Sequence, residues 1–173
     1  ANRNPGIGFA IVRALAQKMP EGTTVVLTSR VPEMGQQAVE DLRKESLNVV
    51  YHQLDISDAG SISSLCQFVK ETFGGVDVLV NNAAIAFPIQ DPTPFPEQAR
   101  QTVDVNYYGT KQMIQSFRPL MRPRCRVVGV SSSAGQLGSS WSEELKARLL
   151  ALDLTTDGLD SIAEEFVAAA AAN

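Results

Sequence analysis

The chain has 173 residues, of which 44% are hydrophobic and 20% charged, and its formal net charge is −4. This length and composition are typical of one globular domain and exclude a disordered or fibrous chain. Because an acidic chain with no Lys/Arg run has no basic surplus for a phosphate backbone, we expect no nucleic-acid partner.

The predicted elements alternate between helices and strands along the chain. A glycine loop at residues 1–8 opens a segment whose apolar residues recur at helical spacing. Short apolar runs bounded by turn residues predict strands near residues 23–28, 48–53, 76–81 and 126–130. Helical patterns lie between them, at residues 32–46, at residues 58–74 with Asp58 as the N-cap, and at residues 96–121.

These strands are apolar on both faces, so we expect them in a parallel sheet with helices packed on both sides. Right-handed crossovers then give an α/β fold with a Rossmann-like doubly wound sheet, whose ligands lie at the carboxyl ends of the strands. No domain boundary is evident, and residues 1–173 are interpreted as one partial domain. Residues 135–173 predict two amphipathic helices without a strand between them, which we interpret as a helical insertion.

We expect the sheet to be incomplete at both ends of the chain. The glycine loop opens the sequence without the strand that normally feeds such a loop. At the other end, the tract from Ala168 to Ala172 carries no pattern. It is either a fraying helix or a stretch whose side chains were never identified.

The cysteines and the apolar runs exclude further classes. Cys66 and Cys125 form no CxxC motif, and the single histidine leaves too few ligands for a metal site, so we expect neither a disulfide framework nor zinc. A reducing compartment fits best, either the cytoplasm or an organellar matrix or stroma. The apolar runs are much shorter than the roughly 20 residues that a membrane-spanning helix requires.

Three features point to a dinucleotide. Residues 4–8 (NPGIG) open a helix, where free N–H groups favour a phosphate, although a tight turn is the alternative. Arg30 ends a strand where an NAD-preferring fold usually has an acidic residue, so it suits a 2′-phosphate; alternatively it is a solvated surface arginine. Asp55 follows the next strand and either accepts a bond from the adenine amino group or serves as a turn or N-cap aspartate.

Five segments stand in the order and at the spacing of the short-chain dehydrogenases/reductases: residues 4–8, 54–56, 81–84, 105–110 and 128–132. Residues 91–95 (DPTPF) are similar to the carbonyl reductase branch of that family. The resemblance extends up to the alanine tract. It implies an oxidoreductase that uses NADPH to reduce a ketone, aldehyde or quinone by hydride transfer.

The resemblance also implies residue roles. Gly6 and Gly8, with Ile7 between them, line the pyrophosphate; Asn2, Arg3 and Arg30 lie near the 2′-phosphate; Asp55 and Ile56 hold adenine; and Asn82 and Ala83 flank the adenosine ribose. Asn106 matches the asparagine that kinks its helix and holds a water in the proton relay. Ser132 matches the serine that hydrogen-bonds the substrate carbonyl.

The sequence departs from the family pattern at three places. The glycine loop is longer than usual, which puts the position of Arg3 in doubt, and Ala84 replaces a glycine. The family's catalytic YxxxK follows the serine, whereas no tyrosine follows Tyr108 here, so we expect the chain to end inside a helical insertion before that tyrosine. Tyr107 and Lys111 do spell YxxxK, but we interpret Tyr107 as half of an aromatic pair that packs its helix on the sheet.

The alternative to an enzyme is a catalytically inactive structural or assembly subunit with the same fold. We expect the free enzyme to be a monomer, because by family resemblance the insertion would obstruct the helix pairing of tetrameric relatives. The structural subunit of the alternative would instead belong to a larger complex. The partner of the enzyme is a small-molecule carbonyl substrate, for which Phe87, Pro88 and Ile89 suggest an apolar cleft wall.

Overall fold

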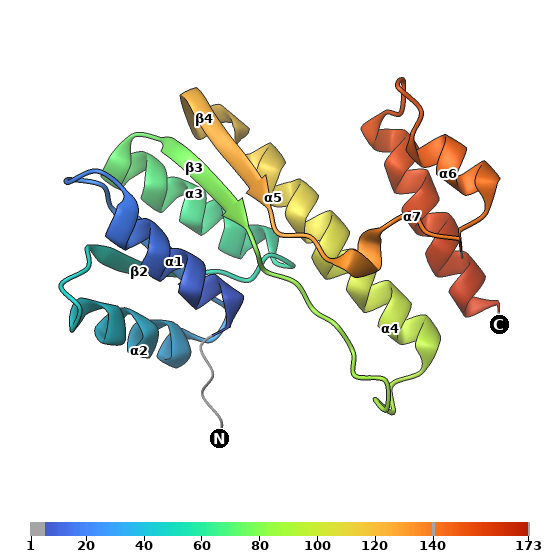
Figure 1. The fold of residues 1–173 in the computed structure, drawn as a ribbon, viewed down its shortest axis with the longest axis horizontal. Coiled ribbons are helices and arrows are strands. Elements are labelled where there is room, and N and C mark those ends of the chain that lie inside the picture. Colours follow the sequence, from blue (N-terminus) through green and yellow to red (C-terminus); the bar gives the residue numbers. More distant parts are fainter. Residues whose placement is uncertain (1–5, 140, 173) are drawn as a thin grey trace. The chain divides into compact units, whose positions relative to one another are not determined.

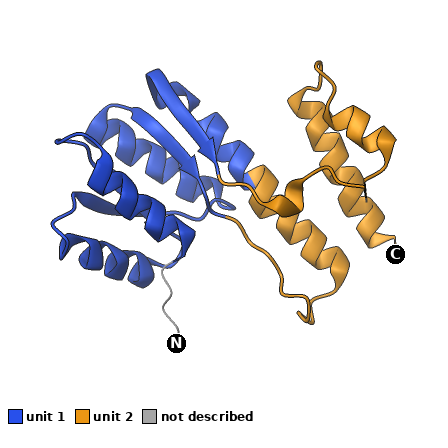
Figure 2. Ribbon diagram, in the orientation of Figure 1, with its two compact units in different colours: residues 1–83, 109–129 blue, residues 84–108, 130–173 orange. Residues whose placement is uncertain are grey.

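The computed structural model describes residues 6–139 and 141–172, and its helices and strands alternate in the predicted order (Figure 1). The predicted positions of Asn2 and Arg3 lie outside the described residues. The chain divides into two compact units, one formed by residues 1–83 and 109–129 and the other by residues 84–108 and 130–173 (Figure 2).

In its described residues, the first unit contains four strands: β1 (Val25–Ser29), β2 (Val49–Gln53), β3 (Val76–Asn81) and β4 (Met121–Gly129). Strands β1 and β2 pair in parallel, with Val25 opposite Val49, and β3 and β4 also pair in parallel, with Leu79 opposite Val127. The parallel direction predicted for neighbouring strands is therefore confirmed. Within the described residues these strands form two two-stranded sheets rather than one continuous sheet.

Four helices belong to the same unit: α1 (Ile7–Lys18), α2 (Pro32–Arg43), α3 (Ala59–Phe73) and α5 (Thr110–Phe117). Asp58 caps α3, because its carboxylate accepts a hydrogen bond from the Gly60 N–H at 2.8 Å. The helix ends at Gly74, which has a left-handed φ of 70°. Both ends of α3 therefore lie where the sequence pattern predicted them.

A buried cluster joins the first two strands to α2. Its members are apolar side chains that are at most 6% exposed: Leu27, Val39, Leu42 and Val49. Helix α2 approaches the sheet closely at Gly35, where a Cβ atom would lie 2.0 Å from Cε2 of Tyr51 and 2.5 Å from Oγ of Ser29. A side chain at this position would force the Tyr51 ring, the Ser29 hydroxyl or the helix to shift from this close packing.

We therefore expect Gly35→Ala in the full-length protein to lower the free energy of unfolding by about 1–3 kcal/mol through overpacking. Urea denaturation measures the change. Gly60→Ala is the matched control, since its Cβ would lie 3.2 Å from Asp58 Oδ1 and alanine is the better helix former by roughly 1 kcal/mol. Equal midpoints for the two variants would contradict this packing.

The predicted helix over residues 96–121 is a continuous helical run with three geometries. Helix α4 (Phe95–Thr102) leads into a π-helical segment, η1 (Val103–Gly109), which is followed by α5 and a 3₁₀ turn, η2 (Arg118–Leu120). At Gly109 a Cβ atom would lie 2.8 Å from the backbone oxygen of Ile56, so this glycine allows the run to approach the loop after β2. π-Helical turns within α-helices are frequent at functional sites.

Strand β4 begins five residues before the predicted start at residue 126. Its first half is irregular: Val76 lies opposite Met121 but Val78 lies opposite Arg126, and Arg124 has a φ of 67°. This extra length on one strand forms a bulge. The sequence did not predict it because Pro123 and the arginines interrupt the apolar run.

The second unit contains α4, most of η1, a 3₁₀ turn η3 (Ser133–Gly135) and two further helices, α6 (Glu143–Leu149) and α7 (Thr156–Ala171). Ser142 and Thr155 cap α6 and α7, each by accepting a backbone N–H. The structure thus has the two predicted helices without a strand between them. The alanine tract continues α7, where Ala170 is 3% exposed.

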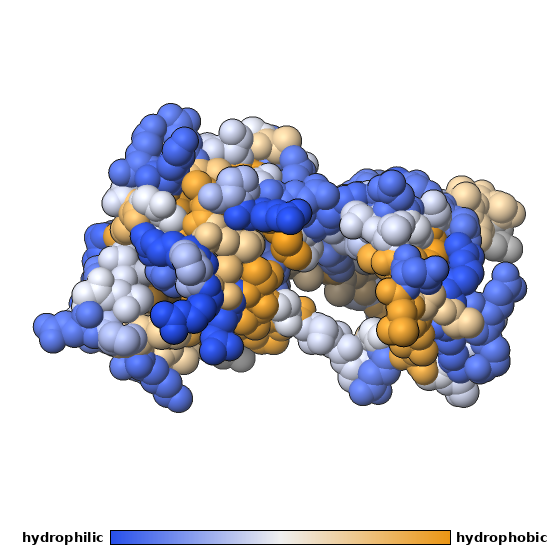
Figure 3. Space-filling view, turned by 90° about the horizontal axis from the view of Figure 1, so that it is seen from above, coloured by the Kyte–Doolittle hydropathy of each residue, from blue (hydrophilic) through white to orange (hydrophobic). Residues whose placement is uncertain are grey.

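Hydrophobic surface remains exposed on both units (Figure 3). In the first unit it includes Val127 and Val128 of β4, which are 44% and 43% exposed. In the second it includes Phe95 and Phe166, at 59% and 49%. No helix in the described part of the chain combines the length and the hydropathy needed to cross a membrane.

Candidate functional site

The start of α1 and the end of β3 meet at Gly8 and Asn82 in the first unit. Gly6 is the N-cap residue of α1, and among the described residues a Cβ built on it would meet nothing within 4 Å. At Gly8 a Cβ atom would lie 2.8 Å from Nδ2 of Asn82. Two predicted cofactor residues that are far apart in sequence are therefore in contact, and a side chain at position 8 would separate them.

Ile7 lies between the two glycines in the first turn of α1 and is 67% exposed. The first N–H groups of a helix have no partner within the helix, and the helix dipole makes this end favourable for an anion. Among the described residues, the exposed Ile7 and the lack of any atom within 4 Å of a Cβ built on Gly6 leave these N–H groups accessible. The local geometry can therefore accept a phosphate group of a ligand.

Asp55 is held in a turn after β2. Its Oδ1 accepts hydrogen bonds from the Ser57 N–H at 2.9 Å and from the Ser57 hydroxyl at 2.6 Å. These bonds, together with the nearby charge of Arg30, lower the pKa of Asp55 below its ordinary value. The carboxylate is ionised at neutral pH, and it already serves as the turn aspartate that sequence analysis offered as one of its two roles.

Arg30 lies directly after β1, at its carboxyl end, and it is exposed. Its backbone oxygen accepts a bond from the Gln53 side chain at 3.4 Å, which ties this end of β1 to the end of β2. Its charge contributes to the lowered pKa of Asp55. An exposed guanidinium at this edge can reach a phosphate.

The remaining predicted cofactor residues differ in exposure. Ile56 is only 8% exposed and packs under Gly109, so its side chain belongs to the core. Asn82 is half-buried and Ala83 is exposed at the end of β3. The neighbouring Asn81 has a buried Nδ2 without a hydrogen-bond partner among the described residues.

In the second unit, Asn106 ties η1 to the segment after β3. Its Oδ1 accepts the Ile85 N–H and its Nδ2 donates to the Ile85 oxygen, both at 2.8 Å. The Asn106 side-chain amide thus pairs with both backbone groups of Ile85, as the backbone of a neighbouring strand would. The side chain acts as a tether, and it lies within the π-helical segment η1.

Ser132 lies three residues beyond β4 and is exposed. Its Oγ accepts the Ala134 N–H at 3.2 Å and so caps η3. A hydroxyl that accepts one bond can still donate its proton. The local geometry therefore allows Ser132 to hydrogen-bond a carbonyl oxygen.

Tyr107 lacks the property that a proton-donating tyrosine needs. Burial, together with a 2.7 Å hydrogen bond from its hydroxyl to Asp160, raises its pKa well above the ordinary value. The Tyr108 hydroxyl donates to Glu164 at 2.7 Å, and this bond is the main reason why its pKa is raised to about 12. A catalytic tyrosine in this chemistry has a lowered pKa, so the pKa of Tyr107 is shifted in the wrong direction.

Sequence analysis missed the polar partners of Tyr107 and Tyr108, which lie on α7. Asp160 and Glu164 lie four residues apart on one helical face, and Arg100 and Asp104 have the same spacing. Arg100 Nη2 donates to Asp104 at 2.5 Å, and Arg100 Nη1 contacts both carboxylate oxygens of Glu164. The i, i+4 spacing of these charges could have indicated polar helix faces, but it does not reveal that the two helices contact each other.

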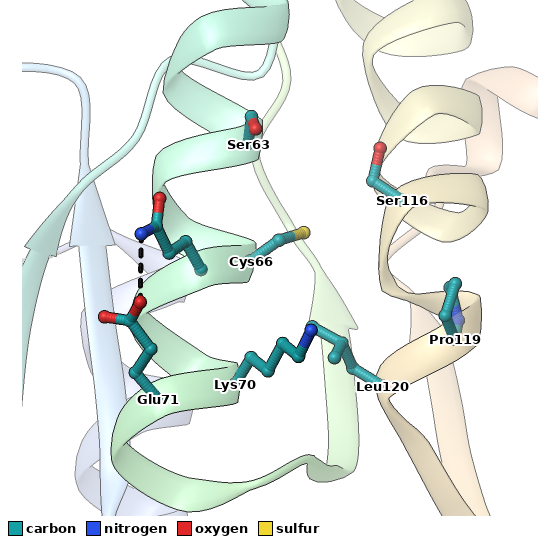
Figure 4. A pocket seen from close by; sticks show the side chains of 8 residues that line it. Ser63, Cys66, Lys70, Glu71, Ser116, Pro119 and Leu120 are labelled. Carbon is teal, nitrogen blue, oxygen red and sulfur yellow. Dashed lines mark hydrogen bonds between the residues drawn. The ribbon is translucent and has the colours of Figure 1, made fainter.

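A groove of about 420 Å³ lies between α3 and α5 in the first unit (Figure 4). It is lined by polar and apolar side chains, among them Cys66, Lys70, Ser116 and Leu120. Partial burial raises the pKa of the Cys66 thiol, so the thiol is less reactive than a free cysteine. The groove lies between helices and not at the carboxyl ends of the strands, where this fold class binds ligands.

Comparison with known proteins gives relatives for nearly the whole chain. The family model described as enoyl-(acyl carrier protein) reductase matches residues 1–156. Carbonyl reductase [NADPH] 1 of Sus scrofa is 44% identical over 165 residues, which cover 95% of this chain and 56% of that protein. The protein of the same name from Homo sapiens is 43% identical, with 95% and 59% covered. The chain thus spans less than three-fifths of the length of these relatives.

Solved structures agree with the sequence relatives. A menthone neomenthol reductase from Mentha piperita matches with a TM-score of 0.83 and 30% identity, covering 94% of this chain and 69% of that one. A metagenomic short-chain oxidoreductase, solved in complex with NADP, matches with a TM-score of 0.64 and 29% identity, covering 76% and 58%. With its glycine loop against Asn82, its parallel strands and these relatives, the chain belongs to the short-chain dehydrogenase/reductase family.

Proposed function

We propose that the full-length protein uses NADPH to reduce the carbonyl group of a small ketone, aldehyde or quinone. The observation that carries this proposal is the contact of Gly8 with Asn82, which brings the first turn of α1 to the end of β3. Carbonyl reductases [NADPH] are 41–44% identical to this chain, and their names indicate the same chemistry. A metagenomic relative was solved with NADP.

The residues of the first unit fit a dinucleotide. The N–H groups at the start of α1 would bind the pyrophosphate, with Gly6 and Gly8 allowing close approach and Ile7 between them. Arg30 would bind the 2′-phosphate, because an exposed guanidinium forms charge-assisted hydrogen bonds with phosphate oxygens. Asn2 and Arg3 stay sequence predictions for the same phosphate.

The other contacts follow from the strand ends. Asp55 and Ile56 would hold adenine after β2, and Asn82 and Ala83 would flank the ribose after β3. The Asp55 carboxylate has two oxygens, and both bonds from Ser57 go to Oδ1. A carboxylate that is already bonded in a turn is fixed in orientation, which suits it to accept a further hydrogen bond.

NADPH, when bound, supplies the hydride for the carbonyl carbon. Ser132 would donate a hydrogen bond to the carbonyl oxygen, where negative charge develops as the hydride arrives. Asn106 would hold η1 against Ile85. The alkoxide that hydride addition leaves must also take up a proton, which by family resemblance would come from the tyrosine of a YxxxK motif that follows the serine. Tyr107 and Tyr108 would not supply this proton, because their raised pKa values disfavour the anion that proton transfer leaves behind.

The test is NADPH oxidation by the full-length protein with a panel of reactive quinones, aldehydes and ketones. We expect turnover with at least one quinone or aldehyde, and weaker turnover with NADH. A full-length protein that binds NADPH but reduces nothing across the panel would instead support the structural-subunit alternative, in which a nucleotide only stabilises the fold.

A further inference from the structure

Three consecutive residues of η1 are held by three different partners. Asn106 bonds both backbone groups of Ile85, Tyr107 donates to Asp160, and the next hydroxyl, that of Tyr108, donates to the α7 residue Glu164. Consecutive residues of a helix project in different directions, so the contact with Ile85 and the two contacts with α7 constrain the helical run at separate points. The segment is thereby fixed in rotation as well as in position.

Arg100 strengthens the attachment of α7 to the helical run. Its Nη1 lies 3.1 and 2.8 Å from the two Glu164 oxygens, and its guanidinium lies 5.8 Å from the centre of the Tyr108 ring. The Arg100 charge and the Tyr108 hydroxyl lower the pKa of Glu164, so this carboxylate is ionised at neutral pH. An apolar contact accompanies the polar ones, since the Phe95 and Phe166 rings pack edge to face at 6.4 Å.

A π-helical segment of seven residues needs such support. π-Helical turns are rare compared with α-helical ones, and they persist where surrounding contacts favour them. If η1 relaxed to α-helical geometry, the residues after the change would rotate relative to those before it. The Asn106 amide would then turn away from Ile85, and the two tyrosine hydroxyls would turn away from α7.

We propose that Asp160 and Glu164 of α7 are positioning residues, which hold η1 in its π-helical register and thereby keep Asn106 bonded to Ile85. Asp160 acts through Tyr107, and Glu164 acts through Tyr108 and Arg100. The consequence for catalysis rests on the proposed function. The structural coupling itself concerns only residues of the second unit.

Hydrogen exchange at the Ile85 amide tests the coupling, because this N–H donates to Asn106 Oδ1. In the full-length protein, the double variant Asp160→Asn/Glu164→Gln should exchange this amide about tenfold faster, as expected from weakening hydrogen bonds to partly exposed carboxylates. Glu165→Gln is the matched control. It makes the same change one residue further along α7, but its partner is Arg148 of α6, at 2.7 Å.

A second variant, Tyr107→Phe/Tyr108→Phe, removes the same hydrogen bonds from the other side and keeps the aromatic rings. It should also accelerate exchange at Ile85. Combining it with the carboxylate variant should add much less than the sum of the two effects, because both break the same contacts. Additive effects would overturn the coupling, as would equal exchange at Ile85 in the double carboxylate variant and in Glu165→Gln.

Uniformly faster exchange across all amides would also overturn the proposal, since it would mean general destabilisation rather than control of η1. In the activity assay, we expect the carboxylate variant to lower kcat by roughly threefold to tenfold with little change in KM, the result of misplacing a supporting group. If the unaltered protein reduces no carbonyl compound, the proposed function fails, and the exchange experiment still decides the positioning role.

Discussion

Replacing Ser132 by alanine in the full-length protein should reduce kcat for carbonyl reduction by about 10²–10³-fold, the loss typical of removing one hydrogen-bond donor to a developing oxyanion. The hydroxyl is exposed and caps η3 by accepting the Ala134 N–H, so its proton is available to a ligand. The rate of NADPH oxidation with a saturating quinone or aldehyde gives kcat directly.

Two variants make this result specific. Ser131→Ala changes the preceding exposed serine and should leave kcat nearly unchanged. Tyr107→Phe should retain turnover within about fivefold, because its hydroxyl is bonded to Asp160 and the group positions a helix rather than donating a proton. A loss of kcat for Tyr107→Phe as large as that for Ser132→Ala would mean that Tyr107 takes part in the chemistry, and would contradict its role in positioning a helix.

Arg30→Asp should reverse the nucleotide preference of the protein. The guanidinium at the end of β1 would lose its charge-assisted bonds to the 2′-phosphate, and the new carboxylate would repel it while accepting bonds from a ribose 2′-hydroxyl. We expect the Kd for NADPH to rise by about 10- to 100-fold, which corresponds to the loss of one or two hydrogen bonds to a charged group. The Kd for NADH should fall or stay constant.

Fluorescence titration with each nucleotide measures both constants. Arg43→Asp is the control, since it places the same charge change on an exposed arginine at the end of α2 in the same unit. Tighter binding of NADH than of NADPH by the unaltered protein would show that Arg30 does not select the nucleotide. An increase in the Kd for NADPH in Arg43→Asp as large as that in Arg30→Asp would show the same.

The regular parts of the fold could be predicted from the sequence because their signals are local. Strands β1 to β3 are short apolar runs with turn residues at their ends, and the predicted bounds differ from the observed ones by at most two residues. Asp58 and Gly74 mark the two ends of α3 directly. The predicted start of β4 was wrong because the irregular first half of this strand contains Pro123 and Arg124, which has a left-handed φ, and neither fits a strand pattern.

The candidate site was predictable only where a motif encodes it. The glycine loop and Asn82 were both singled out, but their contact depends on how α1 packs at the end of β3. The π-helical geometry of η1 leaves no periodic signal in the sequence, because the same residues read as a continuous α-helix. The contacts of Tyr107 and Tyr108 with α7 join residues 53 and 56 positions apart, beyond any local pattern.

That separation along the chain has a consequence for the order of folding. The bond between Asn106 and Ile85 closes 21 residues, whereas the bonds to α7 close 53 and 56, so they must overcome a larger loss of chain entropy. We expect α7 to dock after the transition state for folding has been passed. Asp160→Asn and Glu164→Gln should then accelerate unfolding and leave the folding rate nearly unchanged, with φ-values close to zero in stopped-flow experiments.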